Sequence, residues 1–139
     1  MNSTQIFWPV LVQIMITIGG FMLLGVRKAR AVKSDSVDLA KTALDNDAWP
    51  DDVLKVSNNI RNQFQVPVLF YVLCFMFYSI DAVNVAVVYL AWAFVISRVI
   101  HAYIHMSSNY VPARFGVFTI GFVIMTLMVI LAAKSLLAV

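Results

Sequence analysis

The sequence predicts an all-α membrane protein, a four-helix transmembrane bundle built from a single domain that covers residues 1–139. Hydrophobic residues make up 62% of the chain and charged residues only 12%, whereas soluble domains carry about 25% charged residues. The apolar residues gather in four segments, each able to cross the roughly 30 Å hydrocarbon core of a lipid bilayer as a helix. Composition and segment length together predict an integral, multi-pass membrane protein.

The first predicted helix covers residues 6–26. No basic residues precede it and no small-residue cleavage site follows it, so we interpret it as a retained helix and not as a signal peptide. Pro9 lies in its first turn, where a missing backbone N–H costs little. The adjacent Gly19 and Gly20 predict that another helix approaches closely at this point.

The second predicted helix follows a mixed, charged stretch at residues 31–49 that we interpret as a solvated connector. It begins near Pro50, which suits a first helical turn, and crosses the bilayer over about residues 59–80. Pro67 frees the carbonyl group of Gln63 and predicts a kink in this helix.

A stripe of polar residues precedes the uncharged segment 66–80 of the second helix. Asn58, Arg61, Asn62 and Gln65 have the spacing i, i+3, i+4 and i+7, which places them on one helical face. The uncharged segment makes roughly 22 Å of helix, so the polar turns must help to cross the bilayer. Polar groups at such a depth are costly and therefore predict a functional site.

A short turn at residues 81–84 makes the second and third helices antiparallel neighbours. The third helix, residues 85–106, is purely apolar at first. It then carries Arg98, His101 and His105 at i, i+3 and i+7, which predicts a second polar face.

The fourth predicted helix crosses the bilayer over residues 115–133. Pro112 is well placed in its first turn, and Arg114 follows two residues later. The positive end of the helix dipole at this position favours a bound anion such as a thiolate.

The basic residues predict the orientation of the chain. Of the ten Lys and Arg residues, nine lie between the first and second helices, at the start of the second, or around the connection of the third to the fourth. The positive-inside rule then places these connections in the cytoplasm and both termini outside it, in the inner (cell) membrane. Because orientation explains the net charge of +3, we expect no nucleic-acid partner.

Four arginines are expected to meet near the cytoplasmic face: Arg27, Arg61, Arg98 and Arg114. The chain contains no Glu, and the aspartates near these arginines belong to the connector. Unbalanced guanidinium groups predict an anionic ligand, and the planar fork of arginine suits carboxylates.

Simpler interpretations exist for each polar residue. Arg27 is equally well explained as a snorkelling topology marker, and the amides of the second helix as hydrogen-bonding contacts between helices. His101 and His105 are spaced for a metal ion or a haem, but no further histidine exists on a facing helix. We therefore expect no metal site and interpret both imidazoles as hydrogen-bond partners.

Three stretches carry a family resemblance. They are residues 61–71 (RNQFQVPVLFY), residues 91–95 (AWAFV) followed by Arg98 and His101, and Asn109 with Pro112 and Arg114. In a four-span chain of this length they resemble the membrane-associated proteins in eicosanoid and glutathione metabolism, the MAPEG family. The resemblance implies a homotrimer that binds glutathione, as a co-substrate, between helices of adjacent subunits.

The resemblance also implies roles for individual residues. Arg114 matches the arginine that stabilises the glutathione thiolate, which attacks a lipophilic electrophile from the bilayer or reduces a lipid hydroperoxide. The remaining candidate binding residues are Arg27, Arg61, Asn62, Gln65, Arg98, His101 and His105.

The sequence departs from the family pattern at three positions. Gln65 stands where the family usually has a glutamate, so glutathione affinity falls or the ligand differs. Phe115 replaces a serine of the prostaglandin-forming members, and His105 replaces a tyrosine. The last difference resembles a bacterial-type subgroup.

The sequence also bears on two other classes of function. One is a non-catalytic, lipid-binding or scaffold member of the same family, which Gln65 favours. The other is a small multidrug exporter, which needs a carboxylate within the membrane to couple protons. Because Asp81 lies at a turn, the sequence argues against the exporter.

Overall fold

Four long helical spans dominate the structure, a computed structural model that describes residues 2–138. Each span is long and apolar enough to cross a membrane. A 3₁₀ helix, η1 (Ser3–Ile6), leads into the first. The elements that follow are α1 (Phe7–Lys33), α2 (Leu39–Thr42), η2 (Asn46–Ala48), α3 (Asp51–Gln63), α4 (Val66–Ser79), α5 (Val85–Met106) and α6 (Val111–Leu137). The predicted all-α membrane protein with four spans is confirmed.

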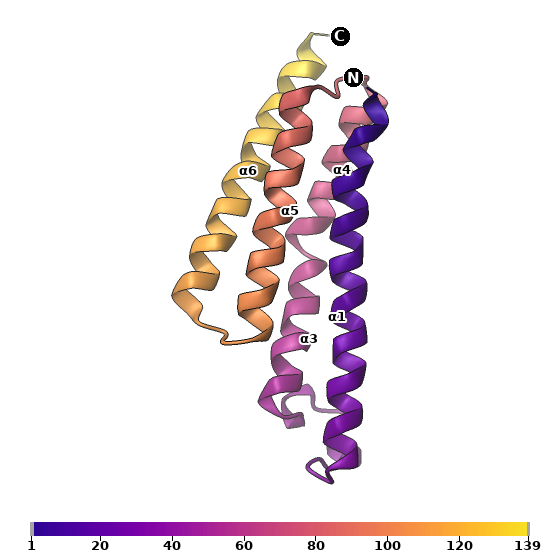
Figure 1. Cartoon of the computed structure of the whole chain (residues 1–139), viewed down its shortest axis with the longest axis vertical. Helices are drawn as coiled ribbons and strands as arrows, with labels where there is room; N and C mark the ends of the chain where they lie inside the picture. The colour runs from indigo at the N-terminus through magenta and orange to yellow at the C-terminus, as the bar shows by residue number, and fades with distance from the viewer. Residues whose placement is uncertain (1, 139) are drawn as a thin grey trace.

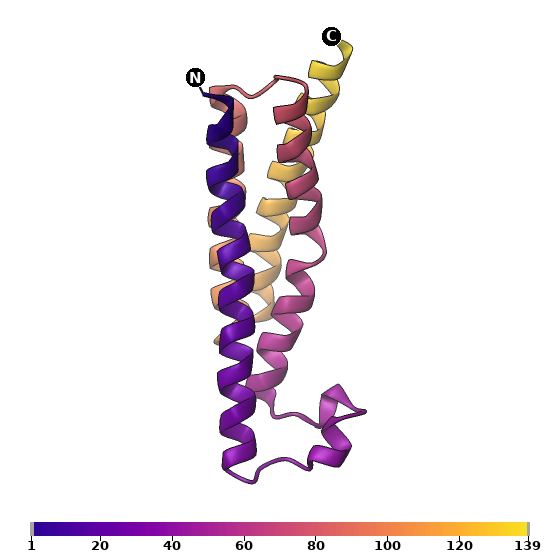
Figure 2. The same cartoon turned by 90° about the vertical axis from the view of Figure 1, so that its right-hand side faces the viewer.

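The helices run side by side along the long axis of the molecule (Figures 1 and 2). α1 packs against α3, and α5 packs against both α6 and α1. The two ends of the chain lie at one end of the bundle, and the connector with α2 and η2 lies at the other (Figure 2). The connection from α5 to α6 also lies toward the connector end (Figure 1).

Prolines mark the starts of two helices as predicted. Pro50 immediately precedes α3, and Pro112 lies in the first turn of α6. The missing N–H of Pro112 costs nothing in the first turn because that group has no partner inside a helix.

The second span is broken rather than kinked. α3 ends at Gln63, and the backbone of Gln65 has φ −104° and ψ −102°, outside the helical region. α4 then starts with Pro67 in its first turn, because proline cannot donate to the helix that precedes it. The prediction that one continuous helical face carries the polar stripe is therefore wrong at Gln65.

Apolar side chains fill the bundle on the terminal side of this break. The rings of Phe70 on α4 and Phe94 on α5 stack with centroids 4.6 Å apart.

On α1, the buried Gly20 lies against α3, and a Cβ atom there would be 3.3 Å from Cγ1 of Ile60. Among residues 2–138, a Cβ atom added at Gly19 would have no atom within 4 Å beyond its adjacent residues and its own helix backbone. The close approach predicted for the glycine pair thus depends on Gly20 alone.

A buried chain of amides joins α1 to α3. Gln13 donates to Oε1 of Gln63 at 2.8 Å, and Gln63 donates to Oδ1 of Asn59 at 3.3 Å. Only the bond from Gln13 to Gln63 crosses between the helices, and such bonds in a bilayer are worth about 0.6 kcal/mol on average. The amides therefore contribute modestly to the packing of α1 on α3.

Candidate functional site

The polar face of α5 turns inward at the connector end of the bundle. Arg98 is 1% exposed, His101 2% and His105 7%. The two imidazole rings lie edge to face with centroids 5.5 Å apart. Because the spacing i, i+3, i+7 aligns them on one side, the prediction that they share a face is confirmed.

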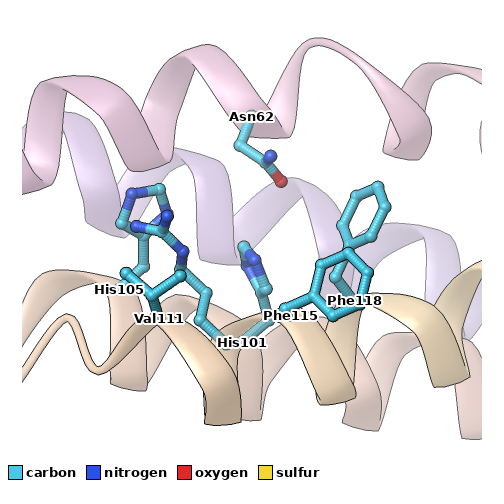
Figure 3. A pocket seen from close by; sticks show the side chains of 7 residues that line it. Asn62, His101, His105, Val111, Phe115 and Phe118 are labelled. Carbon is cyan, nitrogen blue, oxygen red and sulfur yellow. The ribbon is translucent and has the colours of Figure 1, made fainter.

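His101 and His105 border a cavity of about 220 Å³ between α3, α5 and the start of α6. Its lining consists of Asn62, His101, His105, Val111, Arg114, Phe115 and Phe118. The amide of Asn62 points across the cavity toward His101 and Phe118 (Figure 3). The cavity therefore combines an amide from α3, two imidazoles from α5, and a cation and aromatic rings from α6.

Two guanidinium groups belong to this region, and each is held by an asparagine. Nη2 of Arg98 donates to Oδ1 of Asn62, and Nη1 of Arg114 donates to Oδ1 of Asn109. Cζ of Arg98 lies 5.9 Å from the ring centroid of Phe118. Both acceptors are neutral, so these two contacts orient the arginines without cancelling their charge.

Three buried polar atoms at the site have no hydrogen-bond partner among residues 2–138. They are Nδ1 of His101, Nδ1 of His105 and Nε of Arg98. Buried polar groups are normally paired, and an unpaired one costs about 1–3 kcal/mol. The site thus has unused hydrogen-bonding capacity next to two positive charges.

The charges at the site favour an anionic ligand. Within residues 2–138 no three or more His, Cys, Asp or Glu side chains lie close enough together to hold a metal. The imidazoles instead lie beside Arg98 and Arg114, whose charges repel a cation.

Arg27 lies outside this cavity. Its Nη1 donates to the carbonyl oxygen of Asp52, and its Nη2 donates to that of Met106 at 3.1 Å. Arg27 thus ties the ends of α1, α3 and α5 together, a role that the sequence did not predict. Its contact with a ligand stays a prediction.

Arg61 and Gln65 are exposed in the single chain and do not line the cavity. Arg61 lies one residue before Asn62, on a different face of α3, and Gln65 lies in the break after α3. Of the four arginines expected to meet, the structure brings Arg98 and Arg114 to one site.

Sequence reasoning did not assign Phe118 and Val111 to the site. Phe118 follows Arg114 by one helical turn, so the spacing i, i+4 from the arginine was the signal that could have found it. Val111 precedes Arg114 by three residues on the same face.

Fold and site together define a small four-span membrane protein with an arginine- and histidine-lined cavity near one end of the bundle. A family model for the MAPEG family matches residues 6–134, nearly the whole chain. The chain therefore belongs to the MAPEG family, whose members act generally in glutathione or eicosanoid metabolism at membranes. Neither a search of curated proteins nor a search of solved structures finds a match.

Proposed function

We propose that this protein is a glutathione-dependent transferase or peroxidase that acts on lipophilic electrophiles or lipid hydroperoxides. The observation that carries the proposal is the cavity in which Arg114, at the start of α6, lies with two buried imidazoles and with Asn62, the partner of the buried Arg98. Bound glutathione supplies a thiol, and the protein favours its ionised form.

The residues at the cavity fit an anionic thiol peptide. Arg114 adds a full positive charge to the positive end of the α6 dipole, and both stabilise a negative charge on sulfur. The unpaired Nδ1 atoms of His101 and His105 accept hydrogen bonds from amide or ammonium groups, and Nε of Arg98 donates one to a carbonyl or carboxylate.

The apolar part of the lining suits the second substrate. Phe115 is exposed on the surface of α6, and the ring of Phe118 reaches the cavity beside it (Figure 3). A lipophilic molecule dissolved in the bilayer can therefore approach the thiolate along the aromatic side.

A homotrimer is part of the proposal because one chain does not complete the set of binding residues. Arg61 and Gln65 are exposed, as expected for residues that meet a ligand or a neighbouring subunit at a subunit boundary. The cavity of about 220 Å³ is also smaller than the 300–1,000 Å³ of a typical ligand pocket.

Titration of the thiol tests the assigned role of Arg114. The purified protein is saturated with glutathione, and thiolate absorption in the ultraviolet is followed against pH. We expect thiolate at neutral pH in the wild type and its loss in Arg114→Ala. Lys134→Ala is the matched control, since Lys134 is an exposed cation near the far end of the same helix. Identical titrations for wild type and Arg114→Ala would contradict the proposal.

The exposure of Arg61 and Gln65 also favours a second candidate, a non-catalytic lipid-binding or scaffold member of the family. In that function, the exposed cation and amide contact an anionic lipid headgroup. The two candidates differ in turnover. The scaffold predicts no reaction with a panel of electrophiles and hydroperoxides at saturating glutathione, and no recovery of glutathione binding in Gln65→Glu.

A further inference from the structure

The loop between α5 and α6 depends on one residue with an unusual backbone. Asn109 has φ +54°, in the left-handed region, and its N–H donates to the carbonyl oxygen of Ile104 at 2.7 Å. This bond ties the loop back to the last turn of α5. Asn, Asp and Gly tolerate this conformation, whereas most other side chains are strained by it.

The side chain of Asn109 lies between two cavities. Its Oδ1 accepts a hydrogen bond from Arg114, which lines the candidate site. Asn109 itself lines a second cavity of about 280 Å³, together with Asp51, Leu54, Lys55 and Asn58. The residue whose backbone holds the loop to α5 therefore also fixes the direction of the Arg114 guanidinium.

The chemistry of the acceptor matters as much as its position. The amide oxygen of Asn109 accepts one hydrogen bond from Arg114 and, being neutral, leaves the guanidinium charge uncompensated. A carboxylate at the same place would form a charge-assisted, two-pronged pair with the arginine. The pairing of Arg98 with Asn62 follows the same pattern, so both cations at the site are oriented by neutral groups.

We propose that Asn109 is a positioning residue that holds Arg114 toward the cavity with a neutral oxygen and so keeps its charge available to an anionic substrate. This inference rests on the proposed function of the cavity for its biological meaning. Its physical content concerns Arg114 alone and can be measured without glutathione.

Two substitutions separate the orienting contact from the backbone. Asn109→Asp keeps the shape and the left-handed conformation but replaces the neutral acceptor with a carboxylate. Asn109→Gly keeps the conformation and removes the acceptor. Because both residues accept φ +54°, we expect both variants to fold, which the size-exclusion profile in detergent checks.

The first readout is the rate at which phenylglyoxal modifies Arg114, measured by mass spectrometry of the full-length protein. The exposed Arg30 serves as the internal reference in each sample. We expect modification about tenfold slower in Asn109→Asp, where the carboxylate engages the guanidinium, and faster in Asn109→Gly. Equal rates in all three proteins would overturn the proposal.

The second readout is the pH titration of bound glutathione. Asn109→Asp is expected to raise the midpoint of thiol ionisation by about 1 pH unit, since the new negative charge opposes the thiolate. If the wild type binds no glutathione while the modification rates keep the expected order, the proposed function fails and the role of Asn109 stands. If Asn109→Asp titrates like the wild type, that role is wrong and the proposed function stands.

Discussion

The two glycines of α6, Gly116 and Gly121, differ in the space available for a Cβ atom. A Cβ atom at Gly121 would lie 2.8 Å from Oγ of Ser97, closer than real Cβ contacts. Ser97 cannot easily move away because its hydroxyl donates to the carbonyl oxygen of Phe94 at 2.6 Å. A Cβ atom added at Gly116, on the same helix, would have no such contact within 4 Å in the described part of the chain. Only Gly121 is required by packing between α5 and α6.

Gly121→Ala is therefore expected to destabilise the protein, whereas Gly116→Ala is not. Overpacking costs about 1–3 kcal/mol, while the added alanine at an open helical position changes the free energy of unfolding by about 0.5–1 kcal/mol in the favourable direction. Unfolding by sodium dodecyl sulfate in mixed micelles measures both. The double variant Gly121→Ala with Ser97→Ala should recover most of the loss, because the next Ser97 atom is 3.8 Å away. If the double variant is no more stable than Gly121→Ala alone, the contact with Oγ of Ser97 is not the cause of the loss.

At the scale of the helices, the end of α5 is held by cations from two other elements. Arg27 from α1 donates to the carbonyl oxygen of Met106, and Nζ of Lys55 from α3 donates to that of Ser107 at 3.1 Å. The last carbonyl groups of a helix have no partners within it and carry the negative end of its dipole. The two cations satisfy these groups and fix α5 against its neighbours.

These two hydrogen bonds, from Arg27 and Lys55 to the end of α5, form a clamp. Removing the contact from Arg27 should loosen the last turn of α5. We expect Arg27→Ala to speed amide hydrogen exchange at residues 103–106 by the equivalent of about 1–2 kcal/mol, while exchange in the middle of α5 stays unchanged. Arg30→Ala, an exposed arginine one turn further along α1, is the control. Unchanged exchange in Arg27→Ala would contradict the clamp and return Arg27 to the roles predicted from sequence.

The elements themselves were predictable to different degrees. Hydropathy and the positions of Pro50 and Pro112 correctly located the spans, because these signals act within a few residues of where they are found. The break after Gln63 was anticipated as a kink only. Whether a proline bends a helix or ends it depends on which neighbours satisfy the freed groups, and these come from tertiary packing.

The candidate site was predictable where it depends on one helix. Arg98, His101 and His105 follow from spacing within α5. The sequence did not predict that Arg98 on α5 pairs with Asn62 on α3. It also did not predict that Arg27 donates to backbone carbonyl groups. A sequence shows which groups share a helical face. The hydrogen-bond partner of a long flexible side chain depends instead on distances that the packing of all the helices determines.

At the scale of the molecule, charge is distributed unequally between the two ends. The connector end carries Arg27, Lys28, Arg30 and Lys33 at the end of α1 together with the candidate site, whereas Lys134 lies near the terminal end. Lys28 also lies over the ring of Trp49, with Nζ 4.5 Å from the centroid, which anchors the connector against α1. We propose that this end faces the cytoplasm of the cell and lies at the inner membrane surface.

Cysteine labelling tests the proposed orientation. Cys74 is buried and is first replaced by alanine. In that background, Thr4→Cys near the start of the chain should react with a membrane-impermeant maleimide applied to the outer face of the membrane, and Ser36→Cys in the connector should react only after permeabilisation. Both positions are exposed, so access and not burial controls the result. The reverse pattern would invert the orientation.

The break between α3 and α4 also has a consequence for biosynthesis. α4 has 14 residues and makes about 21 Å of helix, too short to be stable across the bilayer by itself. α3, with its acidic start and its arginine, offers the translocon little apolar driving force. The ribosome adds α5 directly after the turn that follows α4, so we expect α4 and α5 to leave the translocon together as a helical hairpin. We then expect α3 to pack against α1 in a later step, when Gln63 forms its hydrogen bond with Gln13.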